Sequence, residues 1–190
     1  MKRVILHWTG GGHTPNSTDI KAYHFLIAGD GKVVPGHFSV SANSSARGSL
    51  VPGTYAAHCK GLNTDSIGIS LCAMLGAKEV PFSPGSAPIT EKQITALSKL
   101  VAEMCIVYQI PVTPQTVLTH AEVEGTLGVK QEQKWDIRYL PGYTKLLSAT
   151  DAGIILRRGI QAEYDRLTGK TKKTNGFAAL VNLFKKIFGK

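Results

Sequence analysis

The sequence predicts a mixed α/β (α+β) domain with one central sheet flanked by helices, followed by a helical C-terminal extension. Short apolar runs with strand character recur along residues 2–118, and one long amphipathic stretch lies among them at residues 90–109. Strands mixed with helices are typical of a sheet that is covered by helices. With 190 residues, 43% of them hydrophobic, the chain is long enough to bury such a core.

The first strands come from the N-terminal part of the chain. An apolar run at residues 2–7 predicts the first strand, and residues 22–28 predict the second. Gly29-Asp30-Gly31 predicts a tight turn into a hairpin partner at residues 32–34, because Asp-Gly is a strong hairpin signal.

Two stretches around these strands are expected to be loops. Residues 10–22 contain three consecutive glycines followed by Pro, Asn, Ser and Thr, and residues 35–65 are rich in Gly, Ser, Pro and Asn. The second stretch should form a long surface loop over the functional site. Residues 66–72 then predict a strand with one apolar face formed by Ile67, Ile69 and Leu71.

Residues 90–109 form the clearest predicted helix. Thr90 and Gln93 make a capping box at its start, and Pro111 ends it. Its apolar stripe repeats at steps of three and four residues and is predicted to face the core: Ile94, Leu97, Val101, Met104 and Tyr108. A last core strand near residues 116–118 should lead directly to His120.

We divide the chain into a main domain at residues 1–142, a helical extension at 143–168, a polar linker at 169–176 and a cationic amphipathic helix at 177–190. Six lysines and no acidic residue lie in residues 170–190, so this part carries +6 of the net charge of +9. The basic balance belongs to the tail, and we expect no nucleic-acid partner. No apolar stretch is long enough to span a membrane.

The tail has the pattern of a helix that lies in a membrane interface. Its apolar face is formed by Phe177, Leu180, Val181, Phe184, Ile187 and Phe188. We therefore predict that residues 177–188 contact an anionic membrane or lipopolysaccharide surface. The alternative is that this face packs against the main domain as an ordinary terminal helix.

Three side chains have the chemistry of a metal site. His7 and His120 each follow a short apolar run, and Asp136 comes sixteen residues after His120. Two imidazoles and one carboxylate, with a fourth position open, are typical of a catalytic rather than a structural zinc site. The spacing alone leaves a second interpretation open, in which each histidine is an ordinary polar strand end.

Several segments occur in an order that is typical of one known family. They are Val4-Ile5-Leu6-His7-Trp8-Thr9, Tyr23-His24-Phe25-Leu26-Ile27, Asn63-Thr64-Asp65-Ser66-Ile67-Gly68-Ile69, Leu118-Thr119-His120 and Lys134-Trp135-Asp136. Together they resemble the type 2 zinc N-acetylmuramoyl-L-alanine amidases, which include phage lysozyme-amidases and peptidoglycan-recognition proteins. The resemblance covers roughly residues 2–142.

The resemblance implies a reaction and a cofactor. The reaction is hydrolysis of the amide between the lactyl group of N-acetylmuramic acid and L-alanine in bacterial peptidoglycan. The cofactor is Zn²⁺, and His7, His120 and Asp136 match the ligand positions of the family. The fold that it implies is the one shared by these amidases and the peptidoglycan-recognition proteins.

The resemblance also assigns roles to other residues. Tyr23 matches a tyrosine that orients the attacking water and assists proton transfer, and Lys134 matches a basic residue that can stabilise the oxyanion. His58, Asn63 and Thr9 match positions that line the substrate groove. Without the resemblance, Tyr23 would be an ordinary strand aromatic and Lys134 a solvated lysine.

The number and spacing of the three cysteines do not favour thiol chemistry. Their number is odd and no CxxC spacing occurs, so Cys72 and Cys105 are predicted to be buried free thiols. Cys59 follows His58 and could be a nucleophile. Adjacent residues in an extended segment face opposite ways, however, which places His58 badly to activate it.

The apolar run before His7 is only three residues long, which is too short for a secretory signal. We therefore expect synthesis in the host cytoplasm and action at the cell wall or periplasm after release. With the cationic tail, this favours a phage or prophage endolysin that causes host cell lysis. Two alternatives remain: a non-catalytic peptidoglycan-binding protein and a cytoplasmic amidase that recycles muropeptides.

Overall fold

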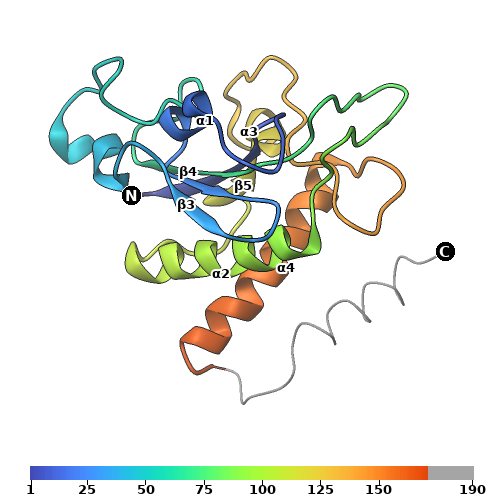
Figure 1. Ribbon diagram of the computed structural model, residues 1–190. Helices are drawn as coiled ribbons and strands as arrows, with labels where there is room; N and C mark the ends of the chain where they lie inside the picture. Colours follow the sequence, from blue (N-terminus) through green and yellow to red (C-terminus); the bar gives the residue numbers. More distant parts are fainter. Residues whose placement is uncertain (171–190) are drawn as a thin grey trace.

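The computed structural model describes residues 1–170, and Figure 1 shows its arrangement. The strands form one sheet in the order β3-β2-β4-β1-β5, with β1 and β4 in its interior. Four strands pair in parallel, and β3 pairs antiparallel with β2 at one edge. The strands are β1 (Arg3–Trp8), β2 (Phe25–Ile27), β3 (Val33–Pro35), β4 (Ser66–Leu71) and β5 (Val117–Thr119).

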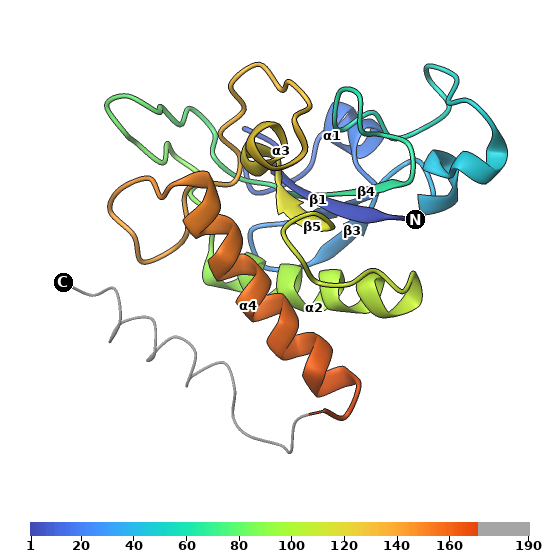
Figure 2. The same cartoon turned by 180° about the vertical axis from the view of Figure 1, so that it is seen from behind.

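Helices cover both faces of this sheet, which confirms the predicted fold class. α2 and α4 pack against each other on one face, while α1, α3 and the long loops lie on the other (Figures 1 and 2). Within residues 1–170, no helix is long and apolar enough to cross a membrane. The helices are α1 (Ser17–Ala22), α2 (Glu91–Val107), α3 (His120–Leu127) and α4 (Ala149–Leu167), with 3-10 turns η1 (Val40–Asn43) and η2 (Ser45–Arg47).

Side chains alternate between the two faces of the sheet, as strand geometry requires. In β1, Val4 and Leu6 enter the main core, which includes residues of α2 and α4, whereas Ile5 belongs to a small second cluster. His7 has the same parity as Ile5 and therefore lies on the loop-covered face. The predicted apolar face of β4 is confirmed, because all three of its residues are buried in the main core: Ile67, Ile69 and Leu71.

The predicted core helix is confirmed as α2. The side chain of Thr90 accepts a hydrogen bond from the backbone N–H of Gln93, and the side chain of Gln93 accepts one from the backbone N–H of Thr90. Leu97 and Val101 are fully buried, and the rest of the stripe packs at the edge of the core.

Two helices were not predicted. Residues 10–22 were expected to be loop, but they contain α1, which Asn16 and Asp19 cap with a reciprocal box. His120 was expected to end a strand, but it is the first residue of α3. Both helices are short, so their apolar periodicity is too brief to register in the sequence.

The C-terminal part was predicted less sharply. Residues 143–168 were expected to hold one or two helices, and the structure has one, α4. The side chain of Ser148 caps the N-terminus of this helix. Most of the predicted linker and all of the predicted cationic helix at 177–190 lie outside the described residues.

Candidate metal centre and cleft

Two neighbouring strands bring the two histidines together. β1 and β5 pair in parallel with Leu6 opposite Thr119, so His7 and His120 leave the same edge of the sheet. Ligand sites in parallel sheets form at this carboxyl edge. A loop returns Asp136 to the same place, where its carbonyl oxygen accepts a hydrogen bond of 2.6 Å from the backbone N–H of Ala121 in α3.

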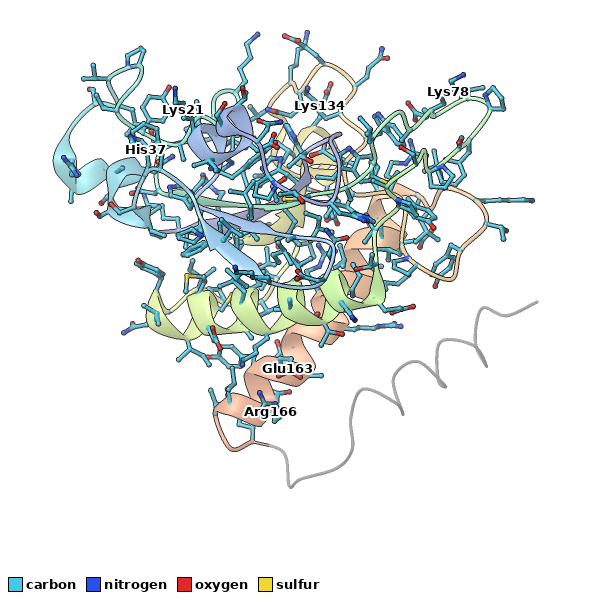
Figure 3. The ribbon with its side chains drawn as sticks, in the orientation of Figure 1. Lys21, His37, Lys78, Lys134, Glu163 and Arg166 are labelled. Atoms are coloured by element: carbon cyan, nitrogen blue, oxygen red, sulfur yellow. The ribbon has the colours of Figure 1, made fainter. Side chains whose placement is uncertain are left out.

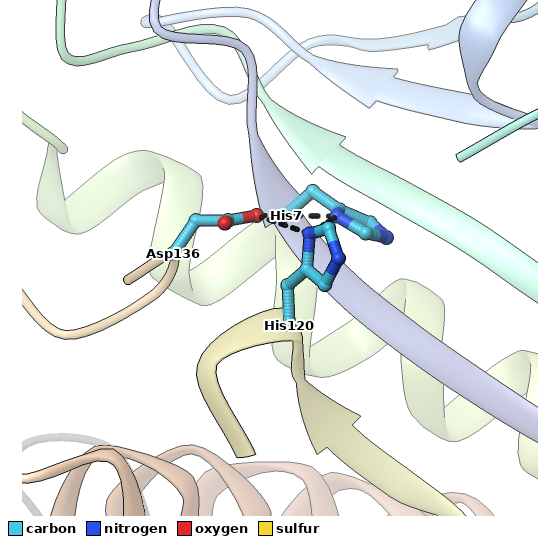
Figure 4. Close-up of side chains that lie close together, drawn as sticks. All are labelled: His7, His120 and Asp136. Atoms are coloured by element: carbon cyan, nitrogen blue, oxygen red, sulfur yellow. Dashed lines mark hydrogen bonds and ion pairs between the residues drawn. The ribbon is translucent and has the colours of Figure 1, made fainter. Parts of the chain in front are cut away.

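The three candidate ligands form a nearly equilateral triangle (Figure 4). His7 Nδ1 lies 3.0 Å from His120 Nδ1 and 3.1 Å from Asp136 Oδ2, and His120 Nδ1 lies 3.2 Å from Asp136 Oδ2. Ligand atoms bound tetrahedrally to zinc lie about 3.3 Å apart. All three residues are buried. The spacing, the donor types and the burial therefore fit a zinc ion.

The far nitrogen of each imidazole also has a partner. His7 Nε2 lies 3.2 Å from His58 Nδ1, and His120 Nε2 lies 2.8 Å from Gln131 Oε1. Since the Gln131 oxygen can only accept, His120 Nε2 donates this hydrogen bond, and Nδ1 is the nitrogen that faces the triangle. Partners of this kind fix the tautomer and orientation of metal-binding histidines.

The surrounding loop holds His58 firmly. Asn63 Oδ1 accepts hydrogen bonds of 2.9 Å from the backbone N–H groups of both His58 and Cys59. Gly68 in β4 lies directly under the His58 ring, where a Cβ atom would collide with it. His24 lies beside them and is hydrogen-bonded through Nε2 to Asn43 Oδ1. The His24 side chain is itself buried.

The pKa values of the two histidines shift in opposite directions. Burial lowers the pKa of His7 to about 4, although its hydrogen bond to Asp136 opposes the shift. Burial also lowers that of His120, but its hydrogen bonds, first to Asp136, raise the pKa to about 10. Both imidazoles hold the pKa of Asp136 well below its usual range, although its burial raises it. Because the three side chains are in contact, they titrate together as one coupled group.

A cleft of about 570 Å³ opens above the triangle. His120 and Asp136 line this cleft, whereas His7 is 1% exposed and is not part of the lining. Every other residue that the sequence singled out also lines it: Thr9, Tyr23, His58, Asn63 and Lys134. Figure 3 marks Lys134 on the loop that leads to Asp136.

The two residues proposed for catalysis differ in their surroundings. The Tyr23 ring lies 5.2 Å from the His7 ring, measured between centroids. Burial and the nearby Asp136 charge raise the pKa of the Tyr23 phenol, so it stays protonated at neutral pH. Lys134 lies close enough for its charge to lower the pKa of His7.

The three residues assigned to the substrate groove are partly engaged in the protein itself. Asn63 uses its side-chain oxygen to hold the loop, and Thr9 Oγ1 accepts a hydrogen bond from Gly11 N. The His58 ring contacts His7, and its Nε2 has no partner among the described residues. This Nε2 atom is buried, so it does not face the cleft.

Sequence reasoning missed Gln131, because nothing marked it among the polar residues at 130–134. Its amide also joins two loops: its Nε2 donates to the carbonyl of Lys60 at 2.9 Å, and its Oε1 accepts from Cys59 Sγ at 3.4 Å. Cys59 is buried, as are Cys72 and Cys105, and all three are free thiols. The prediction of buried free thiols for Cys72 and Cys105 is confirmed.

Fold and site together define an α/β protein with a candidate single-metal centre under an open cleft. Residues 1–142 match the family model described as N-acetylmuramoyl-L-alanine amidase, and the chain belongs to this family. The resemblance inferred from the sequence motifs is thereby confirmed. A search of curated proteins finds no match.

Several solved structures are similar to this one. The hydrolase AmiA from Staphylococcus aureus, in complex with its ligand, has a TM-score of 0.58 and 13% identity, over 90% of this chain and 76% of that one. The amidase LysC from Clostridium intestinale has a TM-score of 0.40 and 18% identity, over 68% and 86%. AmiD from E. coli, in complex with an anhydro-muropeptide substrate, has a TM-score of 0.41 and 23% identity, over 64% and 48%. The likeness to AmiA supports the fold assignment.

Proposed function

We propose that this protein is a zinc-dependent N-acetylmuramoyl-L-alanine amidase that acts as a phage or prophage endolysin. The bond that it cleaves is the amide between N-acetylmuramic acid and L-alanine in peptidoglycan. The observation that carries the proposal is the buried triangle of His7, His120 and Asp136, with edges of 3.0–3.2 Å, under an open cleft.

These three residues would hold the zinc ion, and neighbouring side chains orient them for binding. Zinc at this position would polarise the carbonyl of the scissile amide and activate a water for attack. His58 and Gln131 keep the imidazole rings oriented through their far nitrogens. Because metal ligands must be unprotonated, the low pKa of His7 favours binding, while His120 has a proton to lose.

Tyr23 and Lys134 would assist the reaction from the walls of the cleft. The protonated phenol of Tyr23 can orient the attacking water and relay a proton toward the leaving amine. The ammonium of Lys134 can stabilise the negative charge that develops on the carbonyl oxygen. His58 lines the cleft beside them and is the proposed substrate contact.

Two alternatives make different predictions. A non-catalytic peptidoglycan-binding protein would not need Tyr23 and Lys134 beside a complete ligand set, and both line this cleft. A cytoplasmic muropeptide-recycling amidase would use the same site but would have little use for the lysine-rich residues 170–190. The endolysin proposal also places the action of the protein at the cell wall after release.

The test is mass spectrometry of purified peptidoglycan after digestion by the full-length protein. The expected products are intact stem peptides with a free L-alanine amine, formed with zinc and not after chelation. Glycan fragments instead would identify a glycosidase and overturn the proposal. Binding without any new product would favour the non-catalytic alternative, and activity on soluble muropeptides alone would favour recycling.

A further inference from the structure

A buried ion pair links α4 to the start of α3. Arg157 Nη1 donates to Glu122 Oε2 at 2.9 Å, and Arg157 Nη2 donates to Glu122 Oε1 at 2.8 Å. The two parallel hydrogen bonds form the bidentate geometry that is strongest for an arginine and a carboxylate. Arg157 is 8% exposed and Glu122 is 5% exposed, so solvent hardly reaches the pair.

Both members of the pair also hold the backbone where β5 becomes α3. Glu122 Oε2 accepts a hydrogen bond of 2.9 Å from the backbone N–H of Thr119, the residue before His120. Arg157 Nη1 donates to the carbonyl of Val117 in β5 at 3.0 Å. The pair therefore fixes the junction from which the His120 side chain projects toward His7 and Asp136.

α4 is shaped to receive this carboxylate. Gly153 lies one turn before Arg157, and a Cβ atom there would collide with the Glu122 carboxylate. Glu122 thus packs directly against the α4 backbone. A buried ion pair adds little stability compared with apolar residues of the same shape, so stability alone is a weak reason for this arrangement.

We propose that α4 supports the metal centre: the Arg157–Glu122 pair positions His120 and thereby sets the metal affinity of the site. Arg157 and Gly153 lie beyond residues 1–142, the part that matches the family model. The helical extension is on this account a functional part of the site rather than an appendage. The inference rests on the proposed zinc function.

The experiment measures the zinc dissociation constant by competition with a chromophoric chelator, at a temperature where near-UV circular dichroism shows every variant folded. Arg157→Met removes the guanidinium and keeps an apolar stem. Gly153→Ala leaves both charges in place but displaces the carboxylate. Ile160→Ala is the matched control, because Ile160 is fully buried on the same helix and belongs to the main core.

We expect Arg157→Met to raise the zinc dissociation constant about 10–100-fold, the usual effect of losing a group that orients a metal ligand. Gly153→Ala should also raise the zinc dissociation constant. Ile160→Ala should lower the melting temperature but leave the zinc dissociation constant within about twofold of the parent value. If Arg157→Met does not fold, the test is the comparison of the zinc dissociation constants of Gly153→Ala and Ile160→Ala.

Equal changes in zinc affinity among the variants and the control would overturn the inference, because they would reflect general destabilisation. If the parent protein binds zinc tightly and the variants bind it equally tightly, only the role of α4 is refuted, and the proposed zinc function stands. A parent protein that binds no zinc would refute the proposed function, and the inference with it.

Discussion

Tyr23 and Lys134 allow the catalytic role of single residues to be separated from metal binding, because neither belongs to the ligand triangle. Tyr23→Phe keeps the ring beside His7 and removes only the phenol hydroxyl. We expect it to retain zinc and to lower kcat about 10²–10⁴-fold, the usual contribution of a positioned proton-transfer group. Lys134→Ala should cost about 10²–10³-fold, as one lost oxyanion donor does.

The measurement is turnover on purified peptidoglycan, with zinc content determined in the same samples. Val107→Ala is a suitable control, because this exposed residue lies on α2, away from the cleft. Near-parent turnover of both variants at full zinc content would make these residues bystanders.

The candidate ligands were predictable from the sequence, and their partners were not. His7 and His120 are separated by 113 positions, but each follows an apolar run, and family motifs surround both. Gln131 is a common polar residue in a polar loop, and only the fold brings it to His120. The His7–His58 contact was missed for the same reason, since it depends on how the long loop folds back.

At the scale of elements, Asp65 anchors that long loop. Its carboxylate accepts hydrogen bonds from Ser45 N and Ser45 Oγ, each at 2.8 Å, and pairs with Lys2 Nζ at 2.8 Å. These interactions, first that with Lys2, hold the pKa of Asp65 well below its usual range. The carboxylate side chain is 7% exposed, although Lys2 itself is largely in solvent.

This shift predicts how stability depends on pH. A carboxyl whose pKa is lower in the folded state stabilises the fold above its unfolded pKa, near pH 4, and the contribution is lost as the pH falls below it. Asp65→Asn should therefore cost about 1–3 kcal/mol at pH 7, the worth of hydrogen bonds to a charged group. Its free energy of unfolding should also fall less than that of the parent between pH 5 and pH 3.

Urea unfolding across this pH range is the measurement. Asp30→Asn, at an exposed carboxylate in the turn between β2 and β3, should follow the acid dependence of the parent protein. A parallel decline of Asp65→Asn and the parent would contradict the assignment.

The elements that the sequence predicted well are the ones with long or distinctive patterns. α2 has a capping box and a five-residue stripe, and the β2–β3 hairpin has an Asp-Gly turn. α1 and α3 have 6 and 8 residues, too few for a helical period to stand out. A capping box, Asn16 with Asp19, was the available signal for α1.

At the scale of the whole molecule, the fold class followed from the mixture of patterns, but the support that α4 gives to the site did not. Arg157 lies 35 positions from Glu122, and nothing in either segment predicts that they pair. Long-range pairing of this kind depends on helix packing, which local periodicity does not specify.

The lysine-rich tail leads to a prediction for the complete chain. If residues 177–188 bind anionic surfaces, a protein shortened after Gly169 should stay folded and active on purified peptidoglycan but lose binding to anionic liposomes. Each lysine near such a surface contributes about 1 kcal/mol, so binding by the full chain should weaken with salt. Vesicle sedimentation at two salt concentrations measures this. Unchanged liposome binding with a sharply lower melting temperature would instead assign the tail to the core.

The central claim, that His7, His120 and Asp136 hold one catalytic zinc ion, is tested most directly by zinc titration of metal-free protein. Bound zinc and amide hydrolysis should rise together and saturate at one ion per chain. Binding should weaken in acid, because zinc must displace a proton from the imidazoles. His120→Ala should lose both signals while α2 remains folded. Full zinc binding by His120→Ala, or full activity of the metal-free parent, would contradict the account.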